Sequence, residues 1–209
     1  MLHLAQTAAK QVRHKLHVGL AHSNTEILDA QRLRYRVFAD ELGARLQTRT
    51  PGVDEDYYDR FCEHLVVRDE LSRKIIGTYR ILSPAAARRA GSYYSETEFN
   101  LERLKHLRDR TVEVGRSCVD PEYRTGGTIA LLWSGLVRYM LQNNYEYLIG
   151  CASIGMADGG HAAAGSRKEL AEQAHASIRL CLEQPVIGSR HIPEDGSRIA
   201  GEQLLLVAD

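Results

Sequence analysis

Residues 111–139, TVEVGRSCVDPEYRTGGTIALLWSGLVRY, decide the fold class. Thr111–Val119 is typical of a β-strand, a polar loop with two glycines follows, and Thr128–Gln142 carries apolar residues at helical spacing. Backbone N–H groups at the start of a helix have no partner within it, and the helix dipole adds positive charge there. The stretch therefore predicts a strand, an anion-binding loop and a helix in succession, although a plain strand–turn–helix connection fits the spacing equally well.

The segments around this stretch alternate between strand and helix patterns. Asn24 is a candidate cap for a helix over Thr25–Leu42, which Gly43 would end. Together these segments predict an α/β (α+β) domain whose mixed, mostly antiparallel sheet is flanked by helices, with one strand–loop–helix–strand crossover. The further expected elements are strands at His64–Val67, Ile75–Leu82 and Tyr147–Cys151, a loop over 44–60, a short Ala/Arg helix or loop at Ser83–Gly91, a short helix at Leu101–Leu107, a candidate helix at Arg167–Leu182, and a strand or frayed end in the final QLLLVAD.

Composition limits the functional classes. The 209 residues carry 27 basic and 27 acidic side chains, so the formal net charge is zero, which argues against a dedicated nucleic-acid-binding protein. No apolar run approaches the roughly 20 residues of a membrane span. The four cysteines form no CxxC pair and the start of the chain has no secretory pattern, so we expect a cytoplasmic protein with reduced thiols.

Six segments in order carry a resemblance to a known family: LRYRVFADELG, DEDYYD, GTYRIL, YYSETEF, EVGRSCVDPEYR and GCASIGMADGGHAAA. The series spans residues 33–164 and resembles the ornithine-acyl-carrier-protein N-acyltransferases, sometimes called hemolysin-like proteins. It is more distantly similar to the acyl-homoserine lactone synthases. The resemblance implies the acyl-CoA N-acyltransferase-like fold. It also implies transfer of a (3-hydroxy)acyl group from acyl carrier protein to the α-amino group of L-ornithine, the first step of ornithine lipid synthesis, with no cofactor.

The loop VDPEYRTGGTIALL resembles the acyl-donor loop of the wider N-acetyltransferase superfamily. The family pattern is Arg or Gln, two residues, Gly, one residue, then Gly or Ala. Arg124 and Gly127 match its first two points, and the third falls on Ile129. This departure argues against acetyl-CoA as the donor. The resemblance implies an acyl-donor site formed by Val119, Arg124, Gly126, Gly127 and Thr128.

Glu113 and Arg116 are the candidate catalytic residues. The acceptor ammonium must lose a proton before it attacks a thioester, and a carboxylate is a natural base for this step. Glu113 lies on the strand that enters the donor loop, so we expect it to act as the base or to position a water. The alternative is a structural ion pair with Arg116 or Arg80. Successive strand residues point to opposite faces, so a Glu113–Arg116 pair would need a bulge or a strand end.

The acceptor site is expected to involve Arg34, Asp56, Asp59 and Arg80, which are positions matched by the lactone-synthase resemblance. The acidic loop that holds both aspartates suits a cationic acceptor such as ornithine, and either arginine could hold the acceptor carboxylate in bidentate fashion. The alternatives are a solvated acidic loop and arginines that anchor it. His161 has no second ligand motif, and we expect no metal site.

The resemblance ends near Ala164, which divides the chain into an N-acyltransferase-like domain (1–164) and an atypical segment (165–209). A shifted or truncated reading frame would leave this segment loosely packed and the sheet without its final strands. The alternative functions are an acyl-homoserine lactone synthase, a degenerate non-catalytic relative and an acetyl-CoA acetyltransferase. Ala44 stands where the lactone synthases have Trp. Leu4, Ala8 and Val12 share one helical stripe near basic residues, a modest sign of peripheral association with the inner face of the inner membrane.

Overall fold

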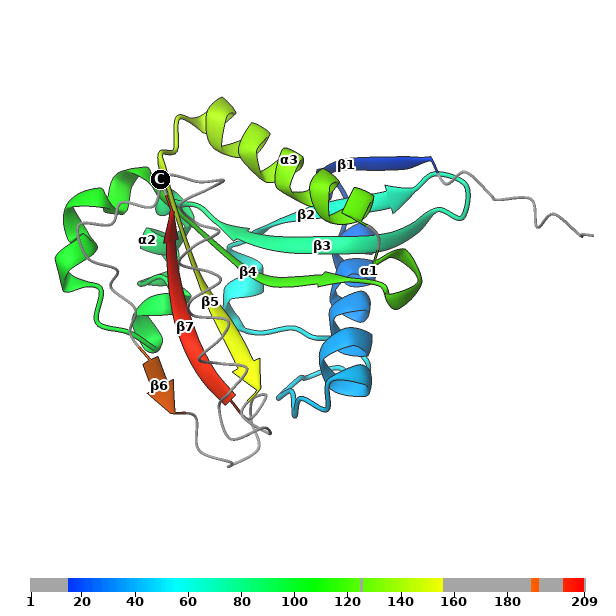
Figure 1. Cartoon of the computed structure of the whole chain (residues 1–209), viewed down its shortest axis with the longest axis horizontal. Coiled ribbons are helices and arrows are strands. Elements are labelled where there is room, and N and C mark those ends of the chain that lie inside the picture. Colours follow the sequence, from blue (N-terminus) through cyan, green and yellow to red (C-terminus); the bar gives the residue numbers. More distant parts are fainter. Residues whose placement is uncertain (1–14, 125, 156–188, 192–200, 209) are drawn as a thin grey trace, which may run out of the picture.

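A seven-stranded sheet with the order β1-β2-β3-β4-β5-β7-β6 forms the centre of the protein (Figure 1). The computed structural model describes residues 15–124, 126–155, 189–191 and 201–208. All neighbouring strands are antiparallel except β4 and β5, which are parallel. The predicted mixed, mostly antiparallel sheet is thus confirmed. The strands are β1 Leu16–Leu20, β2 Glu63–Asp69, β3 Lys74–Leu82, β4 Thr111–Val119, β5 Tyr147–Gly155, β6 Ser189–His191 and β7 Gly201–Ala208.

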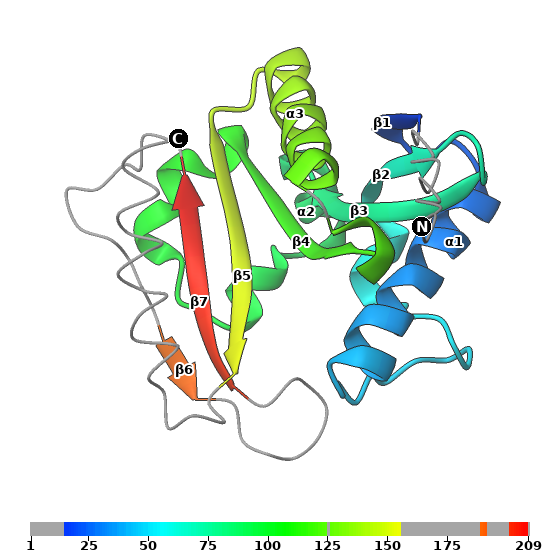
Figure 2. The same cartoon turned by 45° about the vertical axis from the view of Figure 1, so that its right-hand side comes forward.

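Helix α1 (Asn24–Tyr35) covers one face of the sheet, and α3 (Gly126–Asn143) covers the other (Figures 1 and 2). Successive side chains of β2 point to opposite faces of the sheet. Leu65 and Val67 pack in the cluster beneath α3, while Val66 packs in the cluster beneath α1. Each such side chain contributes roughly 1.5–3 kcal/mol by leaving water. The sheet is therefore stabilised from both faces, which explains the near-continuous apolar runs in its central strands.

The helix predicted over Thr25–Leu42 has two parts. Ser23, not Asn24, caps α1, because Ser23 is extended and its hydroxyl accepts the Glu26 N–H. The chain then continues as a π-helix, η1 (Arg36–Glu41), with Leu42 N donating to the carbonyl of Val37. Gly43 ends the segment with φ 71°, as its sequence position predicts. Inserted π turns are frequent at functional sites, and this one contacts the donor loop through an Arg124–Glu41 ion pair.

Strand β4 contains a bulge that reverses its side-chain alternation. Thr78 and Arg80 of β3 are partners of Cys118 and Gly115, so three steps on β4 face two on β3. Arg116 lies within the bulge with φ 51°, a left-handed conformation unusual for a non-glycine residue. Before the bulge Val114 packs on the α3 side, and after it Cys118 packs on the α1 side.

Strands β4 and β5 begin as a pair and then separate (Figure 2). Their register covers Thr111–Glu113 with Tyr147–Ile149 and goes no further within the described residues. On its other edge β5 pairs with β7 from Leu148 to Gly155. At the point of separation a Cβ on Gly150 would lie 2.7 Å from the carbonyl oxygen of Val114. The close approach of the two backbones at this apex therefore requires glycine.

The C-terminal segment supplies two strands of the sheet. Strand β7 pairs with β5 from Leu148↔Ala208 to Gly155↔Gly201, and β6 pairs with β7. The final segment is thus a strand as far as Ala208, and the sheet extends beyond β5. The candidate helix Arg167–Leu182, the stripe through Leu4, Ala8 and Val12, and His161 lie outside the described residues.

Some elements differ from the sequence prediction. The lead segment holds strand β1, which the sequence pattern does not reveal because it is a short edge strand defined by its pairing with β2. The helix predicted at Leu101–Leu107 is a 3-10 helix, η4 (Glu102–Arg110). Three further 3-10 turns of the described chain, η2 (Tyr57–Arg60), η3 (Tyr94–Thr97) and η5 (Pro121–Tyr123), lie in segments without a predicted helix. Helix α2 (Pro84–Ala90) shows that the Ala/Arg segment is a helix and not a loop. In the part of the chain that the structure describes, no helix is long and apolar enough to cross a membrane.

Replacing Gly150 by Ala tests the apex of the separating strands. We expect Gly150→Ala to lower the free energy of unfolding by about 1–3 kcal/mol, because the new methyl group must push β5 away from the Val114 carbonyl. Urea denaturation measures the change. Gly115→Ala is the matched control, since nothing lies within 4 Å of a Cβ built there. Equal effects of the two substitutions would contradict a close contact specific to Gly150.

Candidate active site

A buried ion-pair cluster joins α1, the acidic loop, β3 and β4. Arg34 is completely buried; its Nη1 donates to Asp59 Oδ1 (2.6 Å), its Nη2 to Asp59 Oδ2 (2.9 Å) and its Nε to Asp54 Oδ2 (2.8 Å). Arg80 Nη1 lies 2.6 Å from Asp56 Oδ1. With Arg116 the cluster holds three arginines and three aspartates, so its formal charges balance. The three aspartates of the acidic loop therefore do not present bare negative charge.

Burial and pairing oppose each other in setting the charge of this cluster. Burial tends to raise the pKa of Asp59, but the hydrogen bonds and charge of Arg34, with the charge of Arg80, hold that pKa well below its usual range. Burial likewise tends to raise the pKa of Asp56, and Arg80 lowers it on balance. Both carboxylates are thus ionised at neutral pH. Separating an ion pair of this cluster would leave a buried charge without a partner, which costs free energy. The cluster therefore holds the loop in one position.

Asp56 and Arg116 form the solvent-facing rim of the cluster. Their side chains are 24% and 29% exposed, whereas the side chains of Arg34, Asp54 and Asp59 are no more than 3% exposed. Arg116 is also held loosely, with Nη2 3.4 Å from Asp56 Oδ2 and Nε 3.6 Å from Asp54 Oδ2. Its guanidinium keeps donors for another partner. Of the predicted acceptor-site and catalytic residues in the cluster, only Asp56 and Arg116 can therefore reach a bound molecule without rearrangement.

Glu113 lies at the point where β4 and β5 separate, and it is held by hydrogen bonds rather than by an ion pair. Its Oε2 accepts Tyr94 N–H (2.6 Å), and its Oε1 accepts both Ser95 N–H (2.7 Å) and the Ser95 hydroxyl. Burial raises the pKa of Glu113, and the donors of Ser95 and Tyr94 and the charge of Arg80 moderate this increase. The carboxylate is therefore a stronger base than an exposed glutamate. Ser95 also lies 3.3 Å from Cys151 Sγ.

The two predicted catalytic residues, Glu113 and Arg116, have different partners because of the bulge in β4. A Glu113–Arg116 pair was expected to need a bulge, and the bulge exists, but it directs Arg116 to Asp54 and Asp56. Glu113 instead takes its partners from η3. Ser95 belongs to YYSETEF, a segment of the resemblance that contains none of the predicted site residues. Its position in that segment is the only sequence signal that could have identified it.

The predicted donor-site residues gather at the entry to α3. Arg124 makes a bidentate ion pair with Glu41, with both N–O distances 2.5 Å, and its Nε donates to the carbonyl of Val119. Gly126 and Gly127 are exposed in the first turn of α3. Thr128 is fully buried, and its hydroxyl has no hydrogen-bond partner among the described residues. The first N–H groups of a helix have no partner within it, so this turn is compatible with the anion site, which stays a prediction.

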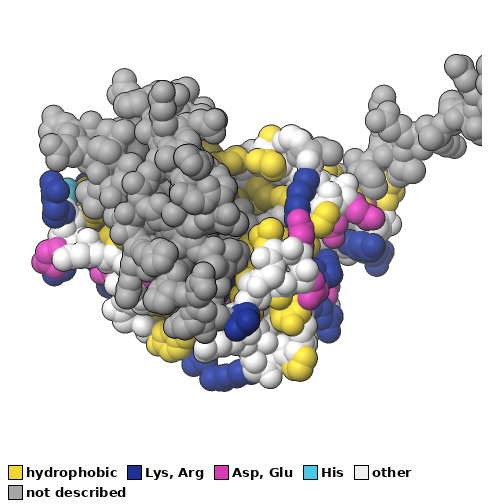
Figure 3. All heavy atoms as spheres, turned by 60° about the horizontal axis from the view of Figure 1, so that its bottom comes forward, with side chains coloured by type: hydrophobic (Ala, Val, Ile, Leu, Met, Phe, Trp, Pro, Cys, Tyr) yellow, Lys and Arg dark blue, Asp and Glu magenta, His cyan; other side chains and the backbone are white. Residues whose placement is uncertain are grey.

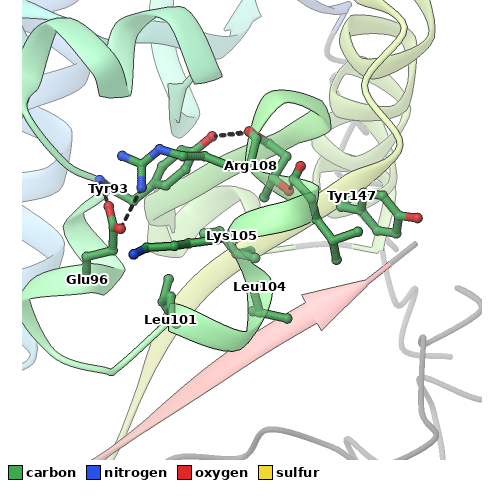
Figure 4. A pocket seen from close by; sticks show the side chains of 10 residues that line it. Tyr93, Glu96, Leu101, Leu104, Lys105, Arg108 and Tyr147 are labelled. Atoms are coloured by element: carbon green, nitrogen blue, oxygen red, sulfur yellow. Dashed lines mark hydrogen bonds and ion pairs between the residues drawn. The ribbon is translucent and has the colours of Figure 1, made fainter.

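A small cavity lies at the closed end of β4 and β5 (Figure 4). Arg108 lies over the Tyr93 ring, 5.0 Å from its centroid, and pairs with Glu96 (2.6 Å), while Leu101 and Leu104 line the opposite side. Its volume of about 20 Å³ holds roughly one water. The cavity cannot take an acyl chain in this conformation, so the contacts of Arg108 serve to fix η3, which in turn holds Glu113.

Charges on the visible surface alternate in sign. Figure 3 shows Lys and Arg side chains interleaved with Asp and Glu rather than gathered into one field. The described residues hold no group of three or more His, Cys, Asp or Glu side chains arranged to bind a metal ion. The geometry therefore offers an acid–base and hydrogen-bonding site between two diverging strands.

Comparison with known proteins identifies a domain family and solved structures that this chain resembles. Residues 33–134 match the acetyltransferase (GNAT) domain family. The N-acyl amino acid synthase FeeM from uncultured soil microbes shares the fold with a TM-score of 0.63 at 12% identity, covering 94% of this chain and 91% of FeeM. The AHL synthase LasI matches with a TM-score of 0.57 at 14% identity, covering 93% and 90%. The chain thus has the GNAT-like fold that the sequence resemblance implies.

Two curated proteins have higher sequence identity to this chain than these structures do. The chain is 42% identical over 147 residues to L-ornithine N(alpha)-acyltransferase of Brucella abortus, covering 66% of this chain and 52% of that protein. It is 41% identical over 147 residues to the protein of the same name from Rhizobium meliloti, covering 66% and 50%. The predicted resemblance to the ornithine N-acyltransferases is confirmed. The chain spans about half the length of these relatives.

Removing Arg34 should destabilise the protein far more than removing a surface arginine of the same helix. Arg34→Met leaves the Asp54 and Asp59 carboxylates buried without their main partner, so we expect a loss of about 3–5 kcal/mol in unfolding free energy. Arg32→Ala breaks only an exposed pair with Asp29 and should cost about 0–1 kcal/mol. Chemical denaturation of both variants measures the difference. Losses of similar size would refute a stabilising role specific to the buried cluster.

His64 makes the fold sensitive to mild acid. It is 2% exposed, Nε2 lies 3.7 Å from Asp59 Oδ1, and neither ring nitrogen has a hydrogen-bond partner in the described structure. Burial lowers the pKa of His64 from 6.5 to about 4, against the opposing charge of Asp59. The unfolded chain therefore binds the extra proton between these values, and stability falls as the pH drops below 6.5.

The expected loss for His64 is about 1.4 kcal/mol of unfolding free energy between pH 7.5 and pH 5.5. Urea denaturation at the two pH values measures it. A His64→Leu variant serves as the control, since it cannot titrate at this position and should lose about 1.4 kcal/mol less than the wild type over the same interval. An unchanged pH dependence in the variant would show that His64 is not the group responsible.

Proposed function

We propose that the protein is an N-acyltransferase that moves a (3-hydroxy)acyl group from acyl carrier protein to the α-amino group of L-ornithine. The observation that carries this proposal is the buried Glu113 carboxylate, fixed by three donors at the apex of two diverging strands. The likeness to proteins named L-ornithine N(alpha)-acyltransferase supports the choice of acceptor.

The donor arm would lie between β4 and β5. Past Glu113 the facing edges of these strands do not pair with each other, so their backbone groups can bond an extended, amide-containing arm as an added strand would. Val119 lies six positions after Glu113, a distance of about 20 Å along the strand. A phosphopantetheine phosphate at the N-terminal turn of α3 would then place the thioester towards Glu113. The arm itself comes with acyl carrier protein, and the proposal requires no other cofactor.

The acceptor would bind at the rim of the ion-pair cluster. The loosely held guanidinium of Arg116 suits the ornithine carboxylate, and Asp56 beside it suits an ammonium group. Arg34, Arg80 and Asp59 are too deeply buried for direct contact, and their part is to fix the acidic loop. Of the four predicted acceptor residues, Asp56 thus contacts ornithine, and Arg34, Arg80 and Asp59 position the loop that carries Asp56.

The reaction needs one proton acceptor. Glu113, directly or through a water, takes a proton from the α-ammonium group, and the free amine attacks the thioester carbonyl. A C–N bond forms and the C–S bond breaks; a second proton passes from the attacking nitrogen to the thiolate, which leaves as the thiol, and Glu113 returns its proton to solvent. The raised pKa of Glu113 suits this role, because it makes the carboxylate a better base near neutral pH.

The substrate test compares two acceptors and two donors. A 3-hydroxyacyl carrier protein is supplied with L-ornithine or with S-adenosylmethionine, and ornithine is also tested with a 3-hydroxyacyl-CoA. Acylornithine formed from the carrier protein is the expected product. Product from S-adenosylmethionine alone would move the protein to the acyl-homoserine lactone synthases, whose fold it shares. No product from a folded sample would support a degenerate relative.

Replacing the base tests the mechanism. Glu113→Gln keeps the size of the side chain but removes the proton acceptor, so we expect kcat/KM for acylornithine formation to fall by about 100-fold or more. Glu96→Gln is the matched control, because Glu96 holds the same turn through Tyr93 N–H and Arg108 without contacting Glu113. We expect it to keep most of the rate. An unchanged rate in Glu113→Gln would exclude Glu113 as the base.

A further inference from the structure

Helix α3 carries a row of large apolar side chains that face solvent. Ile129, Trp133, Val137 and Leu141 are 47%, 38%, 50% and 73% exposed. They are spaced four residues apart, so they form one line along the helix about 18 Å long. We call this row the α3 stripe. An exposed apolar row of this length is uncommon on a soluble domain and marks an interaction surface.

The stripe cannot turn inwards, because the opposite side of α3 is tightly packed. Leu132 and Leu136 lie in the core above β1 and β2. A Cβ on Gly135 would come within 2.6 Å of Val18 Cγ2, so the helix backbone lies directly against β1. The stripe is therefore a fixed outer surface, and the ring of Trp133 meets Tyr79 edge-on at 6.3 Å between centroids.

The charge carried by α3 itself favours an anionic partner. Over its 18 residues α3 has no acidic side chain and one basic one, Arg138, which is exposed. A Trp within an apolar row, on a helix whose one charged side chain is basic, is typical of helices that lie in a membrane interface.

We propose that α3 docks flat on a lipid bilayer with anionic headgroups, with the α3 stripe in contact with the acyl region. The choice of a lipid rests in part on the proposed function, whose product is an amphiphile. The area also favours it: four half-exposed side chains offer roughly 300–400 Å², under half of the about 800 Å² per partner that a stable protein interface buries. A bilayer needs no such complementary area.

Trp133 is the only tryptophan of the chain, so its fluorescence reports on the stripe alone. The full chain is mixed with phosphatidylcholine vesicles that contain about 30% phosphatidylglycerol, a charge density typical of anionic membranes. We expect a blue shift of the emission, protection from iodide quenching and sedimentation with the vesicles. We expect binding to weaken in pure phosphatidylcholine and in high salt, because part of the attraction is electrostatic.

A double variant tests the stripe itself. Val137→Ser with Leu141→Ser changes two side chains that are at least half exposed, and we expect at least about a tenfold loss of vesicle binding with the fold intact. Leu42→Ser is the matched control, since Leu42 is 51% exposed but belongs to the C-terminal cap of η1 and not to the α3 stripe. It should bind as the wild type does.

Two outcomes would overturn the proposal. One is equal vesicle binding by the double variant and the wild type. The other is a wild type that ignores vesicles but changes from dimer to monomer in the double variant, which would assign the stripe to a second copy. Binding is measured without acyl donor, so its failure is distinct from failure of the proposed function. A chain that acylates ornithine but ignores vesicles refutes only the docking, and one that binds vesicles but transfers nothing refutes only the chemistry.

Discussion

The guanidinium of Arg34 is the point on which the site depends. It has no contact with solvent, and it is bonded at once to Asp54 and Asp59 at two places in the acidic loop. An irregular loop of this length would otherwise have many conformations. Because a buried charge without a partner is costly, the loop is held where the aspartates meet Arg34. That position brings Asp56 to the surface beside Arg116, and it brings Tyr58 to the turn that supports Glu113.

Strand β4 links this cluster to the rest of the proposed reaction path. Its bulge turns Arg116 towards the aspartates, its first residues pair with β5, and its last residue precedes the loop into α3. Gly150 allows β5 to approach β4 closely at one point before the strands separate. A single strand thus positions the proposed base, the proposed carboxylate-binding arginine and the proposed phosphate site. The spacing between them is that of an extended backbone and not of flexible loops.

The two faces of the sheet have different roles. The face under α1 holds the charged cluster, and the face under α3 is apolar, with Leu132, Leu136 and Tyr139 in the core. Tyr139 also donates to Glu63, which ties the helix to β2. Because α3 is fixed by these contacts, the side chains on its outer side have no place within the domain. The same packing that supports the donor site therefore leaves the α3 stripe exposed.

Sequence alone determined the main elements of this protein, because local periodicity is strong in them. The strand over Thr111–Val119 was predicted residue for residue, and the helix after it within two residues at its start, since apolar side chains recur there at strand and helix spacing. The order of the motifs also identified the family resemblance. Edge strand β1 and the 3-10 turns escaped prediction, because their conformations depend on pairing with distant segments.

The partners of the charged residues were decided only by the tertiary structure. The family resemblance placed Glu113, Arg116, Asp56 and Asp59 among the candidates, but it could not show that a bulge would send Arg116 to the acidic loop. Nor could it show that Ser95, eighteen residues away, would hold Glu113. A side-chain pattern records what one segment buries, whereas a hydrogen bond between segments depends on where the whole sheet brings them.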